Sequence, residues 1–412
     1  MTLLQSSKKL DFRMISLGIF SAVNLKIGVV LIPIELISVI YMLFFANRVY
    51  RNEHLGLRRF VGWLVFSGII IVISQVFIDL FMEASKLETA KSVAQIVTLV
   101  ALVFTGITWI IQKDLRLESF LIGYVLSSGI TFMFFSNDYI KVDSWKFLFG
   151  NVVTIMILGA LGFTRNTWLF KMTVIISLSL IHLAFGARSL ALFTLLTVVS
   201  LILPSRIVRK RGGLAVLLLF IFSLLMITEQ TYQELALGGT LGVSQQNKAR
   251  QQYESGALLL FARSELLYEI GAIKQSPWIG QGSSPQLSQS LLFAVSRDQE
   301  SFGLHVKETA AYATYLKSGT IPLHSMLFSS WVEAGLVGAF FWVVILYFFL
   351  RYFRVVIASQ NNLTILSTYF LFSALWSLFF SPLGAGSRLF IALAVTCISR
   401  LVITESEVGK QK

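Results

Sequence analysis

The feature that most constrains this chain is a series of apolar segments, each about as long as a bilayer is thick. A membrane-spanning helix needs roughly 17 to 25 mostly apolar residues, because hydrocarbon offers the backbone no hydrogen-bond partners outside the helix itself. A shorter apolar segment at 14–25 is long enough for a half-helix. Eleven full-length segments follow it, at 27–46, 60–80, 93–111, 119–136, 146–163, 168–185, 188–203, 213–228, 325–350, 364–381 and 386–403. The sequence therefore predicts an all-α, polytopic membrane protein.

Composition leads to the same class of protein. Of the 412 residues, 56% are hydrophobic and only 13% are charged, which is too little polar surface to cover a water-soluble globule. A soluble enzyme is thereby excluded. The one cysteine, Cys397, lies in an apolar segment and excludes a disulfide framework or a thiolate metal cluster.

Basic residues are concentrated in alternate connectors between the apolar segments. The chain has 34 Lys and Arg against 21 Asp and Glu, and the connectors 47–59 and 204–212 each contain four basic residues. This pattern is typical of loops kept on the cytoplasmic side, so it explains the net charge better than a nucleic-acid partner does, and no nucleic-acid partner is expected. If residues 14–46 cross twice, the chain has about twelve spans.

The apolar segments divide the chain into three parts. Residues 1–228 form an N-terminal set of transmembrane helices, and residues 323–412 form a C-terminal set. Between them, residues 229–322 form one long connector, which the parity of the spans places on the extracytoplasmic side of the membrane. Its charges nearly balance, so we expect a folded module with short helices lying at the outer membrane surface.

Two arginines stand where the outer membrane edge is expected. Arg188 and Arg388 both follow small residues at the start of apolar segments. A charged side chain at that depth needs a partner or a purpose, although snorkelling to lipid headgroups would also explain either one alone. A planar guanidinium group matches the oxygens of a phosphate. Arg263, in the long connector, is a third candidate, with a helical ion pair as its alternative.

Histidine supplies the candidate for proton transfer. His324 follows Ile321-Pro322-Leu323, where the long connector returns to the membrane, and an imidazole at that point could take a proton from a hydroxyl. His182, near the end of an apolar segment, is better explained by a hydrogen bond between helices than by a cavity. Glu35 lies within an apolar segment without an evident role. The spacing of His, Cys, Asp and Glu shows no metal-ligand pattern, so no metal and no cofactor are expected.

Four segments in order resemble the O-antigen ligase and Wzy-type polymerase superfamily. They are Gly186-Ala187-Arg188-Ser189, then Arg263-Ser264-Glu265 through Ser276-Pro277-Trp278-Ile279-Gly280-Gln281-Gly282, then His324-Ser325-Met326-Leu327-Phe328, and finally Glu333-Ala334-Gly335-Leu336-Val337-Gly338. The resemblance also covers the overall organisation, with many spans and one large outer loop. The family-like motifs themselves cover about 80 residues.

This resemblance implies a fold and a reaction. The fold would be a lipid-sugar glycosyltransferase of the GT-C-like type in the bacterial inner membrane, with residues 229–322 in the periplasm. The reaction would move a glycan from an undecaprenyl-diphosphate-linked oligosaccharide to a hydroxyl of an acceptor glycan or glycolipid. By the matching positions, Arg188 and Arg263 would hold the donor diphosphate and His324 would activate the acceptor; Arg388 is added from topology alone. Membrane lipids and a chain-length regulator protein are further expected partners.

Three functions stay open on the sequence. A Wzy-type polymerase joins lipid-linked repeats, whereas an O-antigen ligase attaches the polymer to lipid A core; we favour the polymerase slightly. Ser325 stands where the family often has Asn, and the last outer loop has no clear acidic residue, so the acceptor is not determined. A lipid-linked glycan flippase or transporter, from a different class, would show charged residues along a central path or two similar halves, and the sequence shows neither.

Overall fold

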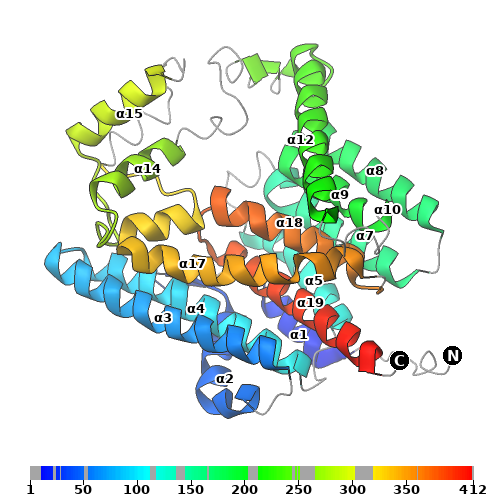
Figure 1. Ribbon diagram of the computed structural model, residues 1–412, viewed down its shortest axis with the longest axis horizontal. Helices are drawn as coiled ribbons and strands as arrows, with labels where there is room; N and C mark the ends of the chain where they lie inside the picture. Colours follow the sequence, from blue (N-terminus) through cyan, green and yellow to red (C-terminus); the bar gives the residue numbers. More distant parts are fainter. Residues whose placement is uncertain are drawn as a thin grey trace.

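The computed structural model describes residues 11–21, 25–27, 29–50, 54–111, 117–135, 144–164, 167–202, 212–243, 246–247, 249–250, 265–301, 319–359 and 361–410, and every structural statement below concerns these residues. They are helical apart from connectors and one short hairpin (Figure 1). The helices are α1 (Phe12–Phe20), α2 (Pro33–Tyr50), α3 (Leu55–Phe81), α4 (Lys86–Ile111), α5 (Leu117–Phe135), η1 (Trp145–Phe149), α7 (Gly150–Phe163), α8 (Trp168–Ala184), α9 (Arg188–Thr197), α10 (Val199–Ile202), α12 (Gly213–Leu237), α14 (Glu265–Gln275), α15 (Gln289–Ser301), α17 (Met326–Ala358), α18 (Thr364–Phe380) and α19 (Ala385–Lys410).

Each of the eleven apolar segments contains a helix. In the part of the chain that the structure describes, α3, α4, α17 and α19 are long and apolar enough to cross a membrane, and six further apolar helices are shorter. One face of α3 leaves large side chains uncovered by protein, among them Phe66, Ile69, Ile73 and Phe77, each at least 50% exposed. Such a continuous apolar face is stable against lipid and not against water. The chain is a helical membrane protein.

A short helix lies in the first apolar segment, as expected of a half-helix, but the second segment starts differently from the expected span at 27–46. Helix α1 ends at Phe20, and the next described residues form an antiparallel hairpin of β1 (Leu25–Ile27) and β2 (Val29–Leu31). Helix α2 begins only at Pro33. Proline fits the first turn of a helix because its missing N–H is not needed there, and it drives the residue before it towards an extended conformation. An apolar pattern alone does not show this start.

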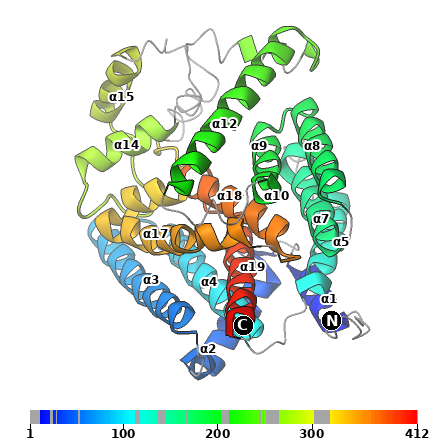
Figure 2. The ribbon, with the colours of Figure 1, turned by 45° about the vertical axis from the view of Figure 1, so that its right-hand side comes forward.

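The core lies between helices that are distant in the sequence. Helix α4 packs against both α2 and α19, α3 packs against α17, and α18 packs against both α17 and α19. Figure 2 shows α7, α8 and α9 together on one flank of this group and α3 on the other. Large aromatic side chains fill the centre, with Phe341, Trp342 and Tyr369 each fully buried.

His182 joins helices inside the N-terminal half, as the favoured sequence interpretation expected. It is fully buried. Its Nδ1 accepts a hydrogen bond from Trp145 Nε1 at 3.1 Å, and its Nε2 lies 2.8 Å from Thr154 Oγ1. Because an indole N–H can only donate, Nδ1 is the acceptor, and in a neutral ring Nε2 carries the proton. This histidine therefore fixes α8 against η1 and α7.

Part of the long connector forms a small helical unit of its own. Helices α14 and α15 pack against each other, and α14 packs on α17; in both ribbon views the two helices lie beyond the first half of α17 (Figures 1 and 2). The unit has a separate apolar cluster made of Tyr268, Ala272, Leu291, Val295, Ile321 and Val332. Since Val332 belongs to α17, this cluster attaches the unit to the bundle.

Candidate functional site

A turn in the connector is bound to a break in helix α17. The turn Ser276–Gly282 lies against α17 where Ala334 and Gly335 leave helical geometry. Gln281 N–H donates to Val332 O at 2.7 Å, Gly282 N–H donates to Glu333 O at 3.0 Å, and Leu336 N–H donates to Trp278 O at 3.2 Å. The backbone groups freed by the break therefore find their partners in the turn.

The glycines of both motifs are required by this close approach. Gly335 has φ +60°, and a Cβ built on it would lie 2.1 Å from the backbone oxygen of Trp278. Gly280 has φ +92°, and its Cβ would lie 2.5 Å from the backbone nitrogen of Gly335. Neither separation is sterically allowed, and both backbone angles favour glycine. The Pro-x-x-Gly-x-Gly turn and the Glu-x-Gly-x-x-Gly segment thus form one structural unit.

The far side of the turn is bound to α3 by a buried carboxylate. Asp79, near the end of α3, is 3% exposed. Its Oδ1 accepts a hydrogen bond from Ser283 N–H at 2.7 Å, and its Oδ2 accepts one from the Ser283 hydroxyl. Two charge-assisted hydrogen bonds to one residue hold the turn in a single orientation between α3 and α17.

His324 is held at the start of α17 by its backbone. Its N–H donates to Glu269 Oε1 on α14, and the same oxygen accepts from Ser325 N–H at 3.0 Å and from the Ser329 hydroxyl at 2.9 Å. Ser325 caps the helix, because its hydroxyl accepts from Phe328 N–H at 3.1 Å and donates to Leu378 O of α18 at 3.0 Å. Serine is a strong N-cap residue, which explains its place at the start of this helix.

Glu269 is the residue that sequence reasoning missed. It is fully buried on α14 between Leu266 and Ala272. Burial raises its pKa to about 7, although the hydrogen bonds from the two backbone N–H groups and Ser329 act in the opposite direction. The sequence did contain a signal for this residue. Leu266, Glu269 and Ala272 follow helical spacing, so Glu269 is a carboxylate on the apolar face of an amphipathic helix.

Two polar atoms in this region are buried without a hydrogen-bond partner among the described residues. They are Glu269 Oε2 and His324 Nδ1. Glu269 Oε2 is an acceptor when the carboxyl is ionised, and His324 Nδ1 is a donor in one tautomer of the ring. The two residues are also joined by the hydrogen bond from the His324 N–H to Glu269 Oε1. The two unpartnered atoms are therefore chemically complementary and belong to residues that are already in contact.

Glu333, from the last motif, extends this polar region towards α4. Its Oε2 accepts a hydrogen bond from the Ser92 hydroxyl at 3.3 Å, while its backbone oxygen binds Gly282. Asp79, Glu269 and Glu333 thus all contact the residues around the turn and the start of α17. We call this set, together with His324, the turn site.

Arg188 has partners within its own part of the fold. Its Nη1 lies 3.5 Å from Glu229 Oε1, and its guanidinium carbon lies 4.4 Å from the centre of the Tyr232 ring. Both partners belong to α12, which continues to Leu237, past the end of the apolar segment at residue 228. The Arg188 side chain remains 28% exposed, so it can reach a second ligand without leaving a sealed core.

Arg388 lies in the first turn of α19, where its side chain is buried between helices. Its side chain is 1% exposed, and that of Glu35 is fully buried. Arg388 Nε donates to Glu35 Oε1 at 2.6 Å, and its Nη2 donates to Glu35 Oε2 at 3.1 Å. Glu35 Oε2 also accepts from Ile32 N–H at 2.9 Å. This pair joins α2 to α19 and gives Glu35 its role; these contacts do not support a substrate-binding role for Arg388.

Arg263, the third arginine, lies outside the described residues. Within the described ranges, no group of three or more His, Cys, Asp or Glu residues is arranged to hold a metal ion. The structure therefore describes three predicted site residues, His324, Arg188 and Arg388. Arg188 contacts Glu229 and Tyr232 of α12, whereas His324 contacts Glu269 of α14.

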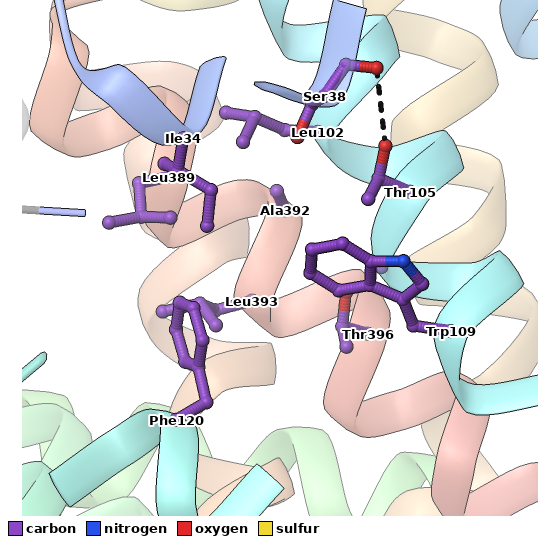
Figure 3. A pocket seen from close by; sticks show the side chains of 11 residues that line it. Ile34, Ser38, Leu102, Thr105, Trp109, Phe120, Leu389, Ala392, Leu393 and Thr396 are labelled. Atoms are coloured by element: carbon purple, nitrogen blue, oxygen red, sulfur yellow. Dashed lines mark hydrogen bonds between the residues drawn. The ribbon is translucent and has the colours of Figure 1, made fainter. Parts of the chain in front are cut away.

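One described cavity is apolar and too small for a sugar. It lies between α2, α4, α5 and α19 and has a volume of about 30 Å³. Its walls are mostly Ile34, Leu102, Phe120, Leu389 and Leu393, and the Thr105 hydroxyl donates to Ser38 O at 3.4 Å across one side (Figure 3). It is a packing gap beside the buried ion pair.

Comparison with protein-family models and with curated proteins found no match for this chain.

Proposed function

We propose that this protein is a membrane glycosyltransferase that moves a glycan from an undecaprenyl-diphosphate-linked donor to a sugar hydroxyl at the periplasmic face, as a Wzy-type polymerase does. The observation that carries the proposal is the turn site. There, two segments that resemble the family's motifs, 276–282 and 333–338, contact each other around the start of α17, directly after His324. The proposed architecture is of GT-C-like type with about twelve spans.

The reaction needs one proton acceptor and one stabilised leaving group. His324 accepts the proton of the acceptor hydroxyl as its oxygen forms a bond to the anomeric carbon of the donor. The bond from that carbon to the lipid diphosphate breaks, and the diphosphate leaves with the electron pair. Arg188 and Arg263 provide positive charge for the departing diphosphate, so the proposed mechanism is metal-independent.

Glu269 is proposed as the positioning residue for His324. In a neutral imidazole that accepts a proton at Nε2, Nδ1 carries hydrogen and needs an acceptor. Glu269 Oε2 is a buried acceptor without a partner, and it belongs to the carboxylate already bonded to the His324 backbone. A hydrogen bond from His324 Nδ1 to Glu269 Oε2 would orient the ring and stabilise the imidazolium formed in the transfer.

Arg188 would take part by exchanging its ion pair with Glu229 for one with the donor diphosphate. Its ion pair with Glu229 at 3.5 Å is partly exposed, so the exchange costs little compared with breaking a buried pair. Arg388 is left out of this mechanism because its guanidinium is buried against Glu35.

The test uses purified full-length protein with a lipid-diphosphate oligosaccharide. His324→Ala should lower the transfer rate roughly 100- to 10,000-fold, and His54→Ala, a matched change beside the start of α3, should leave it unchanged. A ladder of products indicates a polymerase, whereas a single adduct on lipid A core indicates a ligase. Movement of the intact donor across a vesicle membrane without transfer would support a flippase instead. Full transfer activity in His324→Ala would refute the assignment of the general base.

A further inference from the structure

Helices α3 and α17, which pack side by side (Figures 1 and 2), share an exposed apolar surface. Its members are large side chains at helical spacing, each at least 38% exposed: Trp63 and Phe66 on α3, and Phe340, Val343 and Tyr347 on α17. The rings of Trp63 and Phe340 lie edge to face with their centres 6.4 Å apart, so the two helices present these residues next to each other. We call this surface the α3–α17 face.

Three arginines stand at one end of the α3–α17 face. Arg351 and Arg354 follow Tyr347 by one and two turns of α17, and all three of these side chains are exposed. Arg59, also exposed, precedes Trp63 by one turn of α3. Among the residues that the structure describes, no carboxylate lies within ion-pair distance of any of the three arginines. This end of the face therefore carries positive charge that the described protein does not neutralise.

Two tyrosines hold the guanidinium group of Arg351 in place. Its Nη1 donates to Tyr347 Oη at 2.9 Å, and its central carbon lies 6.0 Å from the centre of the Tyr347 ring and 5.8 Å from that of Tyr352. A Cβ built on Gly56 would lie 2.8 Å from Tyr352 Oη and 3.8 Å from Arg351 Nη2, so Arg351 lies over the start of α3. Because a guanidinium has five N–H donors, donors remain for a ligand.

The length of the α3–α17 face matches one leaflet of a bilayer. Arg351 and Phe340 are eleven residues apart in the sequence, which is about 16 Å of helix at 1.5 Å per residue. The hydrocarbon core of a bilayer is about 30 Å thick, so one leaflet occupies about 15 Å. The face also continues through Phe66 into Ile69 and Ile73, on the lipid-facing side of α3. Lipid is therefore the neighbour that this surface meets.

We propose that the α3–α17 face binds an anionic phospholipid, with its phosphate on Arg351 and Arg59 and its acyl chains against Trp63, Phe340 and Val343. The planar guanidinium fork matches the oxygens of a phosphate. A zwitterionic lipid would bring its own ammonium group among the arginines, so the charge at this end favours a lipid of net negative charge. The site lies towards the end of α17 opposite to His324 and is independent of the glycosyltransferase activity proposed above.

The test measures the affinity of the first bound lipid. Purified full-length protein in detergent is titrated with phosphatidylglycerol or with phosphatidylcholine, and bound lipids are counted by native mass spectrometry. The wild type should bind phosphatidylglycerol more tightly. Arg351→Gln should weaken that binding about tenfold, because a charge-assisted hydrogen bond is lost. Arg59→Gln should weaken it about fivefold, as expected of one basic residue at a lipid surface.

A matched variant separates this site from the general attraction of a basic protein for anionic lipid. Arg13→Gln removes the same charge from an exposed position on α1, away from the α3–α17 face, and should bind phosphatidylglycerol as the wild type does. The melting temperatures of Arg351→Gln and Arg59→Gln without added lipid should equal that of the wild type, because neither change removes a described ion pair.

Each outcome supports or overturns the site. Preference for phosphatidylglycerol in the wild type and in Arg13→Gln, together with its loss in Arg351→Gln and Arg59→Gln, supports it. Equal affinity of the wild type for the two lipids overturns it. So does an equal loss in all three variants, because the attraction would then belong to the net charge of the protein. Should Arg351→Gln fail to fold, the comparison of Arg59→Gln with Arg13→Gln decides the outcome.

Discussion

At the scale of single residues, the buried charged side chains that the structure describes have specific partners. Arg388 and Glu35 neutralise each other in the core. Asp79 receives two hydrogen bonds from Ser283. Glu269 receives three on one oxygen and none described on the other. The last case is the exception, because an unsatisfied buried oxygen is costly unless something binds it.

The Arg388–Glu35 pair yields a prediction on stability. Replacing either partner alone, by Arg388→Met or by Glu35→Gln, should destabilise the protein by about 3 to 5 kcal/mol, because a buried charge is left without its partner. The double variant should lose much less than the sum of the two single losses. Melting temperatures of the four proteins in detergent measure this coupling. Additive losses would show that the two side chains do not interact.

Glu269 yields a prediction on pH dependence. Its pKa of about 7 lies above the ordinary carboxyl value of 4.5, so between these values the folded protein holds a proton that the unfolded chain releases. The resulting stabilisation is fully present below pH 4.5 and is lost as the pH rises through 7; it amounts to about 3 kcal/mol at most.

The measurement is the melting temperature between pH 4.5 and 8. It should fall across this range in the wild type, and Glu269→Gln should flatten that fall, whereas Glu265→Gln on the same helix should not. In the transfer reaction, Glu269→Gln should move the acidic limb of the pH–rate profile if Glu269 orients His324. An unchanged profile in that variant would restrict Glu269 to a structural role.

At the scale of elements, the turn Ser276–Gly282 and the break in α17 explain each other. A helix of 33 residues is interrupted at Ala334 and Gly335, and the turn supplies hydrogen-bond partners at the interruption. Three elements, α3, α14 and α17, are thereby joined beside His324. The geometry depends on two glycines more than on any apolar contact.

Gly335→Ala should therefore damage the site more than a glycine replacement elsewhere. The new Cβ would collide with the Trp278 oxygen at 2.1 Å, and φ +60° strains any L side chain, so we expect a loss of about 3 kcal/mol or more and little transfer activity. Gly159→Ala in α7, where no atom lies within 4 Å of the new Cβ, is the control and should be neutral or slightly stabilising. Equal melting temperatures for the two variants would contradict the proposed constraint.

At the scale of the whole molecule, helix ends sort into two groups. Helices α3 and α18 end, and α4 and α17 begin, around the turn site. Asp79 near the end of α3 binds Ser283, Ser92 of α4 binds Glu333, and Leu378 near the end of α18 binds Ser325. A second cavity, lined by Lys171, Ser359 and Thr364 among others, lies where α17 ends and α18 begins. Under the proposed topology, the turn site faces the periplasm and the Lys171 cavity faces the cytoplasm.

Cysteine labelling tests this orientation with little background, because Cys397 is the one cysteine of the chain and is fully buried. A membrane-impermeant maleimide added to intact spheroplasts should label Met82→Cys, just after α3, and should not label Glu407→Cys, near the end of α19. Both should react after the membrane is opened. The reverse pattern in intact spheroplasts would invert the topology and remove the turn site from the periplasm.

The length and number of its apolar segments, which can be counted in the sequence, determined the class of this protein. Long apolar segments can satisfy their backbone groups in lipid only as helices, so helices occur at all eleven segments. The order of Arg, Pro-x-x-Gly-x-Gly, His and Glu-x-Gly-x-x-Gly carried the resemblance from which a glycan transfer is expected. The position of His182 near the end of an apolar segment favoured a hydrogen bond between helices.

Only the tertiary structure decided which distant groups meet. Residues 35 and 388 are 353 positions apart, and no apolar pattern shows that one neutralises the other. Likewise, Glu269 is an ordinary helical carboxylate until α14 packs on α17 and aims it at the backbone of His324. The physical reason is that hydrophobic periodicity fixes helices and their faces, whereas pairing of buried charges depends on how those helices pack.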